Sequence, residues 1–142
     1  NRPEKFLRMI ATDQVDVLMV AMNFVGRHTY GFEDKVRPAA LERKTGLMAM
    51  KVFGGIRGGF AFTRVRRPSQ MDPIHLHIAV RYALNIEGLT GIVLGVHDAA
   101  ELRQNIRFVL NAPPLSPNEL AALDVNGKRI AGEWGPRFGP VA

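Results

Sequence analysis

Three short apolar segments of the sequence each end in residues that suit the binding of an anion. The first ends at Asn23, the second at Lys51 with Gly54 and Gly55 close behind, and the third at Gly95, just before a polar, helix-like segment. Glycine lets a ligand approach the backbone closely. A helix that begins at such a junction directs free N–H groups and the positive end of its dipole outward. These residue types favour a cradle for a phosphorylated ligand.

A simpler interpretation of the same residues stays open. A glycine between a strand and a helix is often only a turn residue, and Lys51 at a strand end can extend its ammonium group into water. The segment 54–59, GGIRGG, matches neither the P-loop nor the dinucleotide-binding pattern GxGxxG. Spacing alone does not decide between a phosphate cradle and ordinary turns.

Hydrolytic and metal-dependent chemistry have weaker support. The sequence contains no GxSxG motif, only two serines and no cysteine, so thiolate metal sites and disulfides are excluded. His75 and His77 are two residues apart on an expected helix and therefore point in different directions. His28 and His97 stand near strand ends but lack a third ligand. We therefore predict no metal site.

The composition is that of a globular protein, since 46% of the 142 residues are hydrophobic and 23% are charged. No apolar run is long enough for a membrane span, and the absence of cysteine makes a reducing cytoplasm the expected compartment. Lys and Arg number 19 against 13 Asp and Glu, a net charge of +6. Because these charges are spread along the chain and RNA-binding aromatic motifs are missing, we predict neither a nucleic-acid partner nor a membrane.

The apolar pattern predicts alternating helices and strands. Nearly continuous apolar runs predict parallel strands buried on both faces, near 15–22, 46–52 and 91–95. Helical spacing predicts helices over 3–12, 32–44, 73–84 and 98–110. Pro38 should kink the second or mark its start near Val36, and Asp98 should cap the fourth. The order predicts an α/β fold with right-handed crossovers, either a doubly wound sheet or a (β/α) barrel.

Several side chains and segments outside the strands also carry expectations. On the fourth helix, four apolar side chains are expected to face the core: Leu102, Ile106, Val109 and Leu110. A long loop over 54–72 holds a cluster of Arg64, Arg66 and Arg67. The segment from Ser116 to Glu119 reads as a capping box, with a helix that pauses at Gly127 and resumes over 128–134. Trp134 and Phe138 should pin this tail to the body rather than bind a ligand.

Three runs of the sequence resemble the aldo/keto reductases, most closely bacterial members of the predicted-oxidoreductase type. They are VDVLMVAMNFVGR at 15–27, TGLMAMKVFGG at 45–55 and RYALNIEGLTGIVLGVHDAAELRQN at 81–105. Their order and spacing match the last three β/α units of that family's (β/α)8 TIM barrel. The resemblance implies that 1–111 form the C-terminal half of the barrel and that 112–142 form a helical C-terminal tail packing on it.

The resemblance also implies a function. The family transfers a hydride between NAD or NADP and a small carbonyl or alcohol substrate, with a tyrosine acid and supporting lysine, aspartate and histidine. By position, the nicotinamide and pyrophosphate would lie along Met50, Lys51, Val52, Phe53 and Gly54. The adenosine end would be surrounded by Gly95, Val96, His97, Glu101, Gln104 and Asn105.

This chain departs from the family pattern at several positions. The catalytic residues of the family come from the first half of the barrel, so the resemblance assigns no catalytic residue here. Met19 replaces a glutamine that bonds the nicotinamide amide in many members, and Met50 replaces an aromatic residue that stacks on the nicotinamide. Glu101 stands where NADP-preferring members often carry arginine. Because a carboxylate repels a 2′-phosphate, NAD is favoured over NADP, unless the arginine cluster compensates.

Three or four strands cannot close a barrel, and an open sheet exposes both edges. We therefore expect an inactive fragment of a longer enzyme, whose partner is the missing N-terminal half, or a half-barrel that pairs with a second copy. The alternative is a non-enzymatic α/β module that binds a nucleotide or another protein through its open edge. A third hypothesis is nucleic-acid binding through the arginine-rich loop.

Overall fold

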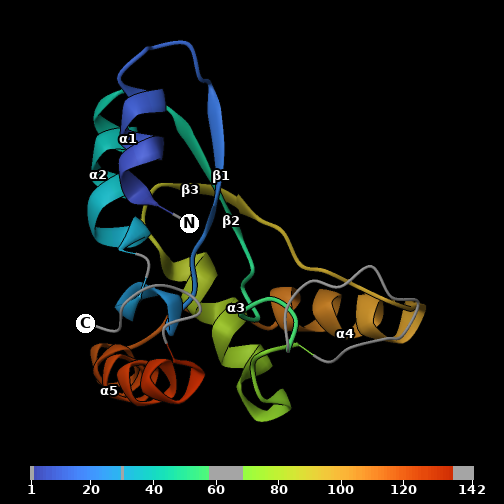
Figure 1. The fold of residues 1–142 in the computed structure, drawn as a ribbon. Coiled ribbons are helices and arrows are strands. Elements are labelled where there is room, and N and C mark those ends of the chain that lie inside the picture. Colours follow the sequence, from blue (N-terminus) through green and yellow to red (C-terminus); the bar gives the residue numbers. More distant parts are fainter. Residues whose placement is uncertain (1, 30, 58–68, 136–142) are drawn as a thin grey trace.

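The computed structural model describes residues 2–29, 31–57 and 69–135 and shows an α/β fold (Figure 1). Three strands, β1 (Val17–Ala21), β2 (Gly46–Met50) and β3 (Leu89–Ile92), form a parallel sheet in that order. β1 and β2 pair from Val17–Gly46 to Ala21–Met50. The parallel sheet predicted from the apolar runs is confirmed, and each pair of neighbours is joined by a crossover that contains a helix.

The strand bounds differ from the prediction, most of all for the third strand. β3 begins at Leu89, which pairs with Leu47, and its register with β2 shifts between Leu47 and Met48. After Ile92 only Val93 continues the ladder, with its N–H donating to the carbonyl of Ala49 at 2.8 Å. Gly95 therefore lies beyond the strand rather than at its end. Strand formation follows pairing, which the apolar run 91–95 does not reveal.

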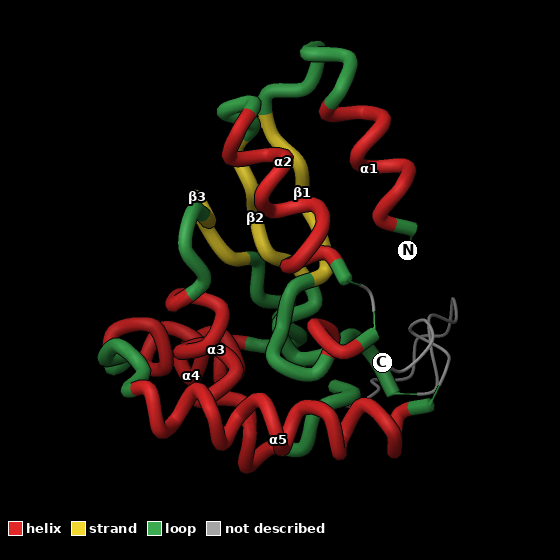
Figure 2. Tube along the Cα trace, turned by 90° about the vertical axis from the view of Figure 1, so that its left-hand side faces the viewer, coloured by secondary structure: helices red, strands yellow, loops and turns green. Residues whose placement is uncertain are grey.

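The sheet is buried on one face and open on the other. α1 (Pro3–Ile10) and α2 (Arg37–Glu42) lie on the same side of β1 and β2 (Figures 1 and 2). Residues alternate across the strands, and the face toward the helices is fully buried at Leu18, Val20, Leu47 and Ala49. The opposite face, here called the open face, consists of Val17, Met19, Met48 and Met50, with Val17 54% and Met19 45% exposed. The expectation of strands buried on both faces is wrong for this chain alone.

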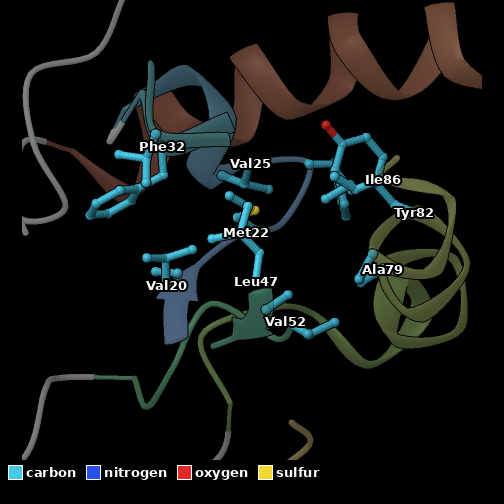
Figure 3. Close-up of a cluster of buried hydrophobic side chains, with 14 of the residues drawn as sticks. Val20, Met22, Val25, Phe32, Leu47, Val52, Ala79, Tyr82 and Ile86 are labelled. Carbon is cyan, nitrogen blue, oxygen red and sulfur yellow. The ribbon is translucent and has the colours of Figure 1, made fainter. Parts of the chain in front are cut away.

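The main core lies where the carboxyl ends of β1 and β2 meet α3 (Leu76–Asn85) (Figure 3). Its side chains come from both strand ends, the loop after β1 and α3, and include Met22, Val25, Val52, Ala79 and Tyr82. α2 is entered through a π-helical turn η2 (Phe32–Val36), with Pro38 in the first α-helical turn. This matches the expectation that the helix proper starts near Val36, because proline has no N–H to donate.

α4 (Ala99–Leu110) carries the clearest disagreement with the sequence-based expectation. The four apolar residues expected to face the core, here called the α4 stripe, are 48%, 48%, 40% and 77% exposed in the order Leu102, Ile106, Val109, Leu110. α4 packs instead on α3, where Phe108 stacks on His77 with ring centroids 5.2 Å apart. The expectation that the α4 stripe faces the core is therefore wrong, because these four side chains stay exposed in the described part of the chain.

α5 (Pro117–Trp134) is one continuous helix, so the predicted pause at Gly127 is wrong. The predicted capping box is confirmed, with the Ser116 hydroxyl accepting from the Glu119 N–H and the Glu119 carboxylate accepting from the Ser116 N–H. Gly127 serves a close crossing, because a Cβ there would overlap the carbonyl oxygen of Phe24.

We expect Gly127→Ala to destabilise the protein even though alanine favours helix by about 1 kcal/mol. The new methyl group has no room against the Phe24 carbonyl, so the helix must move away from the loop after β1. Gly132→Ala in the same helix is the matched control, since Gly132 is exposed and a Cβ there meets nothing within 4 Å. Urea unfolding should show opposite signs for the two variants, and stabilisation by both would contradict the close crossing.

The long loop predicted over 54–72 closes on itself at its base. Ile56 and Ser69 form an antiparallel bridge, and the N–H of Gln70 donates to the carbonyl of Gly55 at 2.8 Å. Arg64, Arg66 and Arg67, as well as Phe138, lie outside the described residues. Among the helices of the described ranges, none combines the length and apolar character needed to cross a bilayer.

Candidate functional site

Asn23 joins the carboxyl ends of β1 and β2. Its side chain is 1% exposed and donates from Nδ2 to the carbonyl of Lys51 at 2.9 Å. Its Oδ1 accepts from the N–H groups of Val25 at 3.1 Å and Gly26 at 2.6 Å. Sequence analysis placed Asn23 at a strand end but gave it no partner. The signal that pointed to it was an amide closing an otherwise apolar run, since buried amides need hydrogen-bond partners.

The turn after β2 contains the residues expected along the nicotinamide and pyrophosphate. Lys51 adopts a left-handed conformation with φ 55°, which is uncommon for a residue with a Cβ. Its carbonyl accepts a second hydrogen bond from the Gly54 N–H at 2.7 Å, which closes the turn. Val52 is 1% exposed and belongs to the core, whereas Met50 and Phe53 are half-buried. Lys51 is also half-buried, so a ligand at this turn can reach the Lys51 side chain but not the Val52 side chain.

Gly95 and Asn105, both predicted at the adenosine end, come together in the structure. The segment after β3 runs extended to α4 (Figure 1), and Gly95 is exposed with open space where a Cβ would lie. Asn105 is 6% exposed and its Nδ2 donates to the Gly95 carbonyl at 3.4 Å. Val96 is 45% exposed, and Gln104 is half-buried.

The N-terminus of α4 is capped by carboxylates of its own sequence. The Asp98 side chain accepts from the Glu101 N–H at 2.8 Å, as the predicted cap requires. Glu101 Oε2 accepts from the His97 N–H at 2.8 Å and lies 3.0 Å from His97 Nδ1. A ligand at this junction therefore meets negative charge as well as the helix dipole. The start of α4 is therefore better suited to a ligand group that donates hydrogen bonds than to a phosphate.

Parallel pairing of β2 with β3 places the Lys51 turn and the Gly95 segment on the same edge of the sheet, after the carboxyl ends of neighbouring strands. This is the edge at which parallel α/β sheets bind ligands. Within the described part of the chain, no three His, Asp or Glu side chains gather closely enough to hold a metal ion.

A polar network behind this edge joins the loop after β1 to α3 and α5, and sequence analysis did not identify it. The hydroxyl of Tyr82 donates to the Glu33 carboxylate, with oxygen–oxygen distances of 2.9 and 2.7 Å. Arg27 Nη1 lies 3.9 Å from Glu33 Oε1, and Arg27 Nε lies 3.7 Å from Asp124 Oδ1. Burial raises the pKa of the Glu33 carboxyl, although Tyr82 and Arg27 act in the opposite direction. Burial and the neighbouring Glu33 also raise the pKa of the Tyr82 hydroxyl.

His28 gives this network a testable pH dependence. Its side chain is 11% exposed, with Nε2 3.6 Å from Asp124 Oδ1. Burial lowers the pKa of His28 below the ordinary 6.5, with Asp124 opposing this effect and Arg27 and Lys128 adding to it. The folded protein therefore takes up this proton less readily than the unfolded chain. Stability from this group is present above pH 6.5 and is lost as the pH falls toward the folded-state pKa.

We expect His28→Gln to flatten the loss of stability below pH 6.5, because it removes a group that the unfolded chain protonates more readily than the folded protein does. Urea unfolding midpoints over a pH series measure this effect. The same substitution at the exposed His97 is the control. An unchanged slope in His28→Gln would contradict the assignment.

Comparison with known proteins gives one informative likeness. No protein-family model matches the chain, and no curated protein matches it. Among solved structures, the chain is similar to the aldo-keto reductase AKR11C1 from Bacillus halodurans in its holo form, with a TM-score of 0.63 and 15% sequence identity. The likeness covers 87% of this chain and 46% of that one, so this chain spans less than half the length of the solved protein. The resemblance found in the sequence is confirmed as a likeness of fold to part of an aldo/keto reductase barrel.

Proposed function

We propose that this chain is the cofactor-binding C-terminal part of an NAD(P)-dependent aldo/keto reductase, and that the catalytic residues belong to the other part. The observation that carries the proposal is the likeness of fold, over 87% of the chain, to an aldo-keto reductase solved in its holo form. The Lys51 turn and the Gly95 segment, which share one edge of the sheet, support it. The substrate in this proposal is a small carbonyl compound or alcohol.

The residues on this edge fit a dinucleotide in their chemistry. The Lys51 ammonium group suits a pyrophosphate, and the open space at Gly95 lets a ligand approach the backbone. Gly54 contributes through the shape of the turn, because its α-carbon is covered by Trp134. The cofactor would supply or accept the hydride. The residues of this chain would bind and orient it: Met50, Lys51, Val52, Phe53 and Gly54 on one side and Gly95, Val96, His97, Glu101, Gln104 and Asn105 on the other.

Glu101 favours NAD over NADP in this proposal. Its carboxylate lies at the start of α4, held by the His97 N–H. A carboxylate there can accept a hydrogen bond from a ribose hydroxyl, as in other dinucleotide sites, but repels a 2′-phosphate. We therefore expect NADH to bind more tightly than NADPH.

The proposed function also requires a protein partner that covers the exposed apolar surfaces of this chain. The open face is apolar and exposed at Val17 and Met19, and the α4 stripe is apolar and exposed throughout. Grouped exposed apolar side chains are typical of an interaction site. The solved aldo-keto reductase extends over more than twice the length matched by this chain. We propose that the missing N-terminal half of the barrel covers both surfaces. The measurement of molecular mass described next would show instead whether two copies of this chain pair with each other.

The test is isothermal titration of the chain with NADH and NADPH, with its molecular mass measured alongside. Lys51→Gln should weaken NADH binding about tenfold, the usual effect of losing one charge-assisted contact. Lys44→Gln is a matched control. The backbone of Lys44 is also left-handed, with φ 55°, but Lys44 precedes β2 and so lies at the other end of that strand. A folded chain that binds neither cofactor, or binds equally well after Lys51→Gln, would contradict the proposal.

The second candidate is a non-enzymatic α/β module that binds another protein. The observation that favours it is the start of α4, where Asp98 and Glu101 already accept from the backbone N–H groups that a phosphate would use. If this candidate is correct, NADH does not change the stability of the chain, whether the chain is alone or associated with another chain.

A further inference from the structure

We infer that Trp134, at the end of α5, is a positioning residue that holds the turn after β2 in its ligand-binding shape. The inference rests on the proposed function, because it concerns the turn assigned to the cofactor. Gly54 is buried, and a Cβ added to it would overlap Cη2 of the Trp134 ring and lie 2.8 Å from Cζ3. The six-membered ring of the indole therefore lies directly against the α-carbon of Gly54.

The turn that Trp134 covers is strained and needs support. Lys51 has φ 55°, Gly54 has φ 74° and Gly55 has φ 82°. Left-handed backbone is easily reached by glycine but disfavoured for lysine, and it persists only where surrounding contacts fix it. One support comes from the loop after β1, since Asn23 donates to the Lys51 carbonyl. The N–H groups of Met71 and Gln70 add two hydrogen bonds, to the carbonyls of Phe53 and Gly55. Trp134 supplies the contact that covers Gly54.

α5 is itself fixed over the strand ends, which makes it a suitable anchor for that support. It runs past the loop after β1 (Figure 2) and crosses the Phe24 carbonyl at Gly127. At its start, Arg81 of α3 donates to Glu119 at 2.7 Å and to the carbonyls of Pro113 and Pro114 at 3.1 and 3.2 Å. These contacts fix the helix at its start and at Gly127, and the buried Ile130 and Ala131 fix its last turns, so contacts other than the one with Gly54 hold Trp134 in place.

This arrangement couples the C-terminal helix to the ligand-binding edge. With the indole in place, the Gly54 N–H stays bonded to the Lys51 carbonyl at 2.7 Å and the Lys51 side chain keeps its direction. Without the indole, the turn loses the contact that covers Gly54, and this part of it samples other conformations. Only the molecules whose turn has the binding shape can then bind the ligand, so its apparent affinity falls in proportion to their fraction.

The experiment compares Trp134→Ala, Trp134→Phe and Val125→Ala in the full chain. Val125 lies on the same helix and is 74% exposed, so it controls for substitution in α5. Amide hydrogen exchange is followed at Gly54 and, for reference, at Ala49 in β2. In Trp134→Ala we expect exchange at Gly54 to accelerate about tenfold relative to Ala49, and NADH affinity to fall about tenfold. Trp134→Phe should give an intermediate effect, because the phenyl ring is shorter than the indole and falls short of the Cη2 and Cζ3 positions that meet Gly54.

A second comparison keeps the inference testable if Trp134→Ala loosens α5. Gly54→Ala should disturb the turn strongly in the parent and less in a Trp134→Ala background, since the overlap with the indole is then gone. Equal effects of Gly54→Ala in both backgrounds, or unchanged exchange at Gly54 in Trp134→Ala, would overturn the inference. If the parent chain does not bind NADH, the proposed function fails while the exchange measurements still decide the role of Trp134.

Discussion

Leu18→Asp should unfold the chain, whereas Met19→Asp, one residue further on β1, should leave it folded. Leu18 is 4% exposed beneath the helices, and Met19 is 45% exposed on the open face. An unpaired carboxylate in the core costs about 3–5 kcal/mol, comparable to the total stability of a small domain. A carboxylate at Met19 keeps its hydration, so we expect a change below about 1 kcal/mol.

Circular dichroism and urea unfolding of the two variants measure this contrast, and Leu47→Asp against Met48→Asp repeats it on β2. Leu47 is fully buried and Met48 is half-buried on the open face. The same variants test the proposed partner, because Met19→Asp should block association with the missing half of the barrel while leaving this chain folded. Equal destabilisation by Leu18→Asp and Met19→Asp would show that the open face is packed within the chain.

The features that sequence alone predicted are those governed by neighbours along the chain. Asp98 and Ser116 were expected to cap helices, and both accept the expected N–H groups, because a cap requires only residues within one turn. The parallel strands were expected from apolar runs, which depend on composition over a few residues. Pro38 was placed correctly for the same reason, since its restriction is local.

The features that sequence missed depend on distant partners. Gly127 looked like a helix break, but its role is set by the Phe24 carbonyl, which only the folded chain brings near. The α4 stripe has the spacing of a core-facing helix, yet the face that would cover it is not supplied by the described residues. Hydrophobic periodicity identifies an apolar face of a helix, but it does not show whether another surface covers that face.

The structure brings some of the expected site residues together, while their contacts with a cofactor stay a prediction. Gly95 and Asn105 were both expected at the adenosine end, and the structure joins them by a hydrogen bond. Val52 was expected along the cofactor, but its side chain lies in the core. The contact of Trp134 with Gly54 follows the expectation that this tryptophan fixes the tail to the body, although the sequence did not indicate which residue it would meet.

Asn23→Ala should cost about 3–5 kcal/mol in unfolding free energy, because it leaves buried polar groups without partners. The Val25 and Gly26 N–H groups lose their acceptor, and the Lys51 carbonyl loses one of its two donors. Asn23→Asp should be less damaging, since a carboxylate still accepts from both N–H groups. It brings its charge close to the Lys51 carbonyl, however, so the turn after β2 should still loosen.

Urea unfolding measures the loss of unfolding free energy in Asn23→Ala and in Asn23→Asp. The control is Asn118→Ala, at an exposed position of α5, which should stay within about 0.5 kcal/mol of the parent. The two variants also separate stability from site geometry. Because Asn23→Asp retains the loop after β1 but not the bond to Lys51, its NADH affinity should fall more than its stability does. An Asn23→Ala variant within about 1 kcal/mol of the parent would mean that packing and the backbone ladder hold the two strand ends together without Asn23.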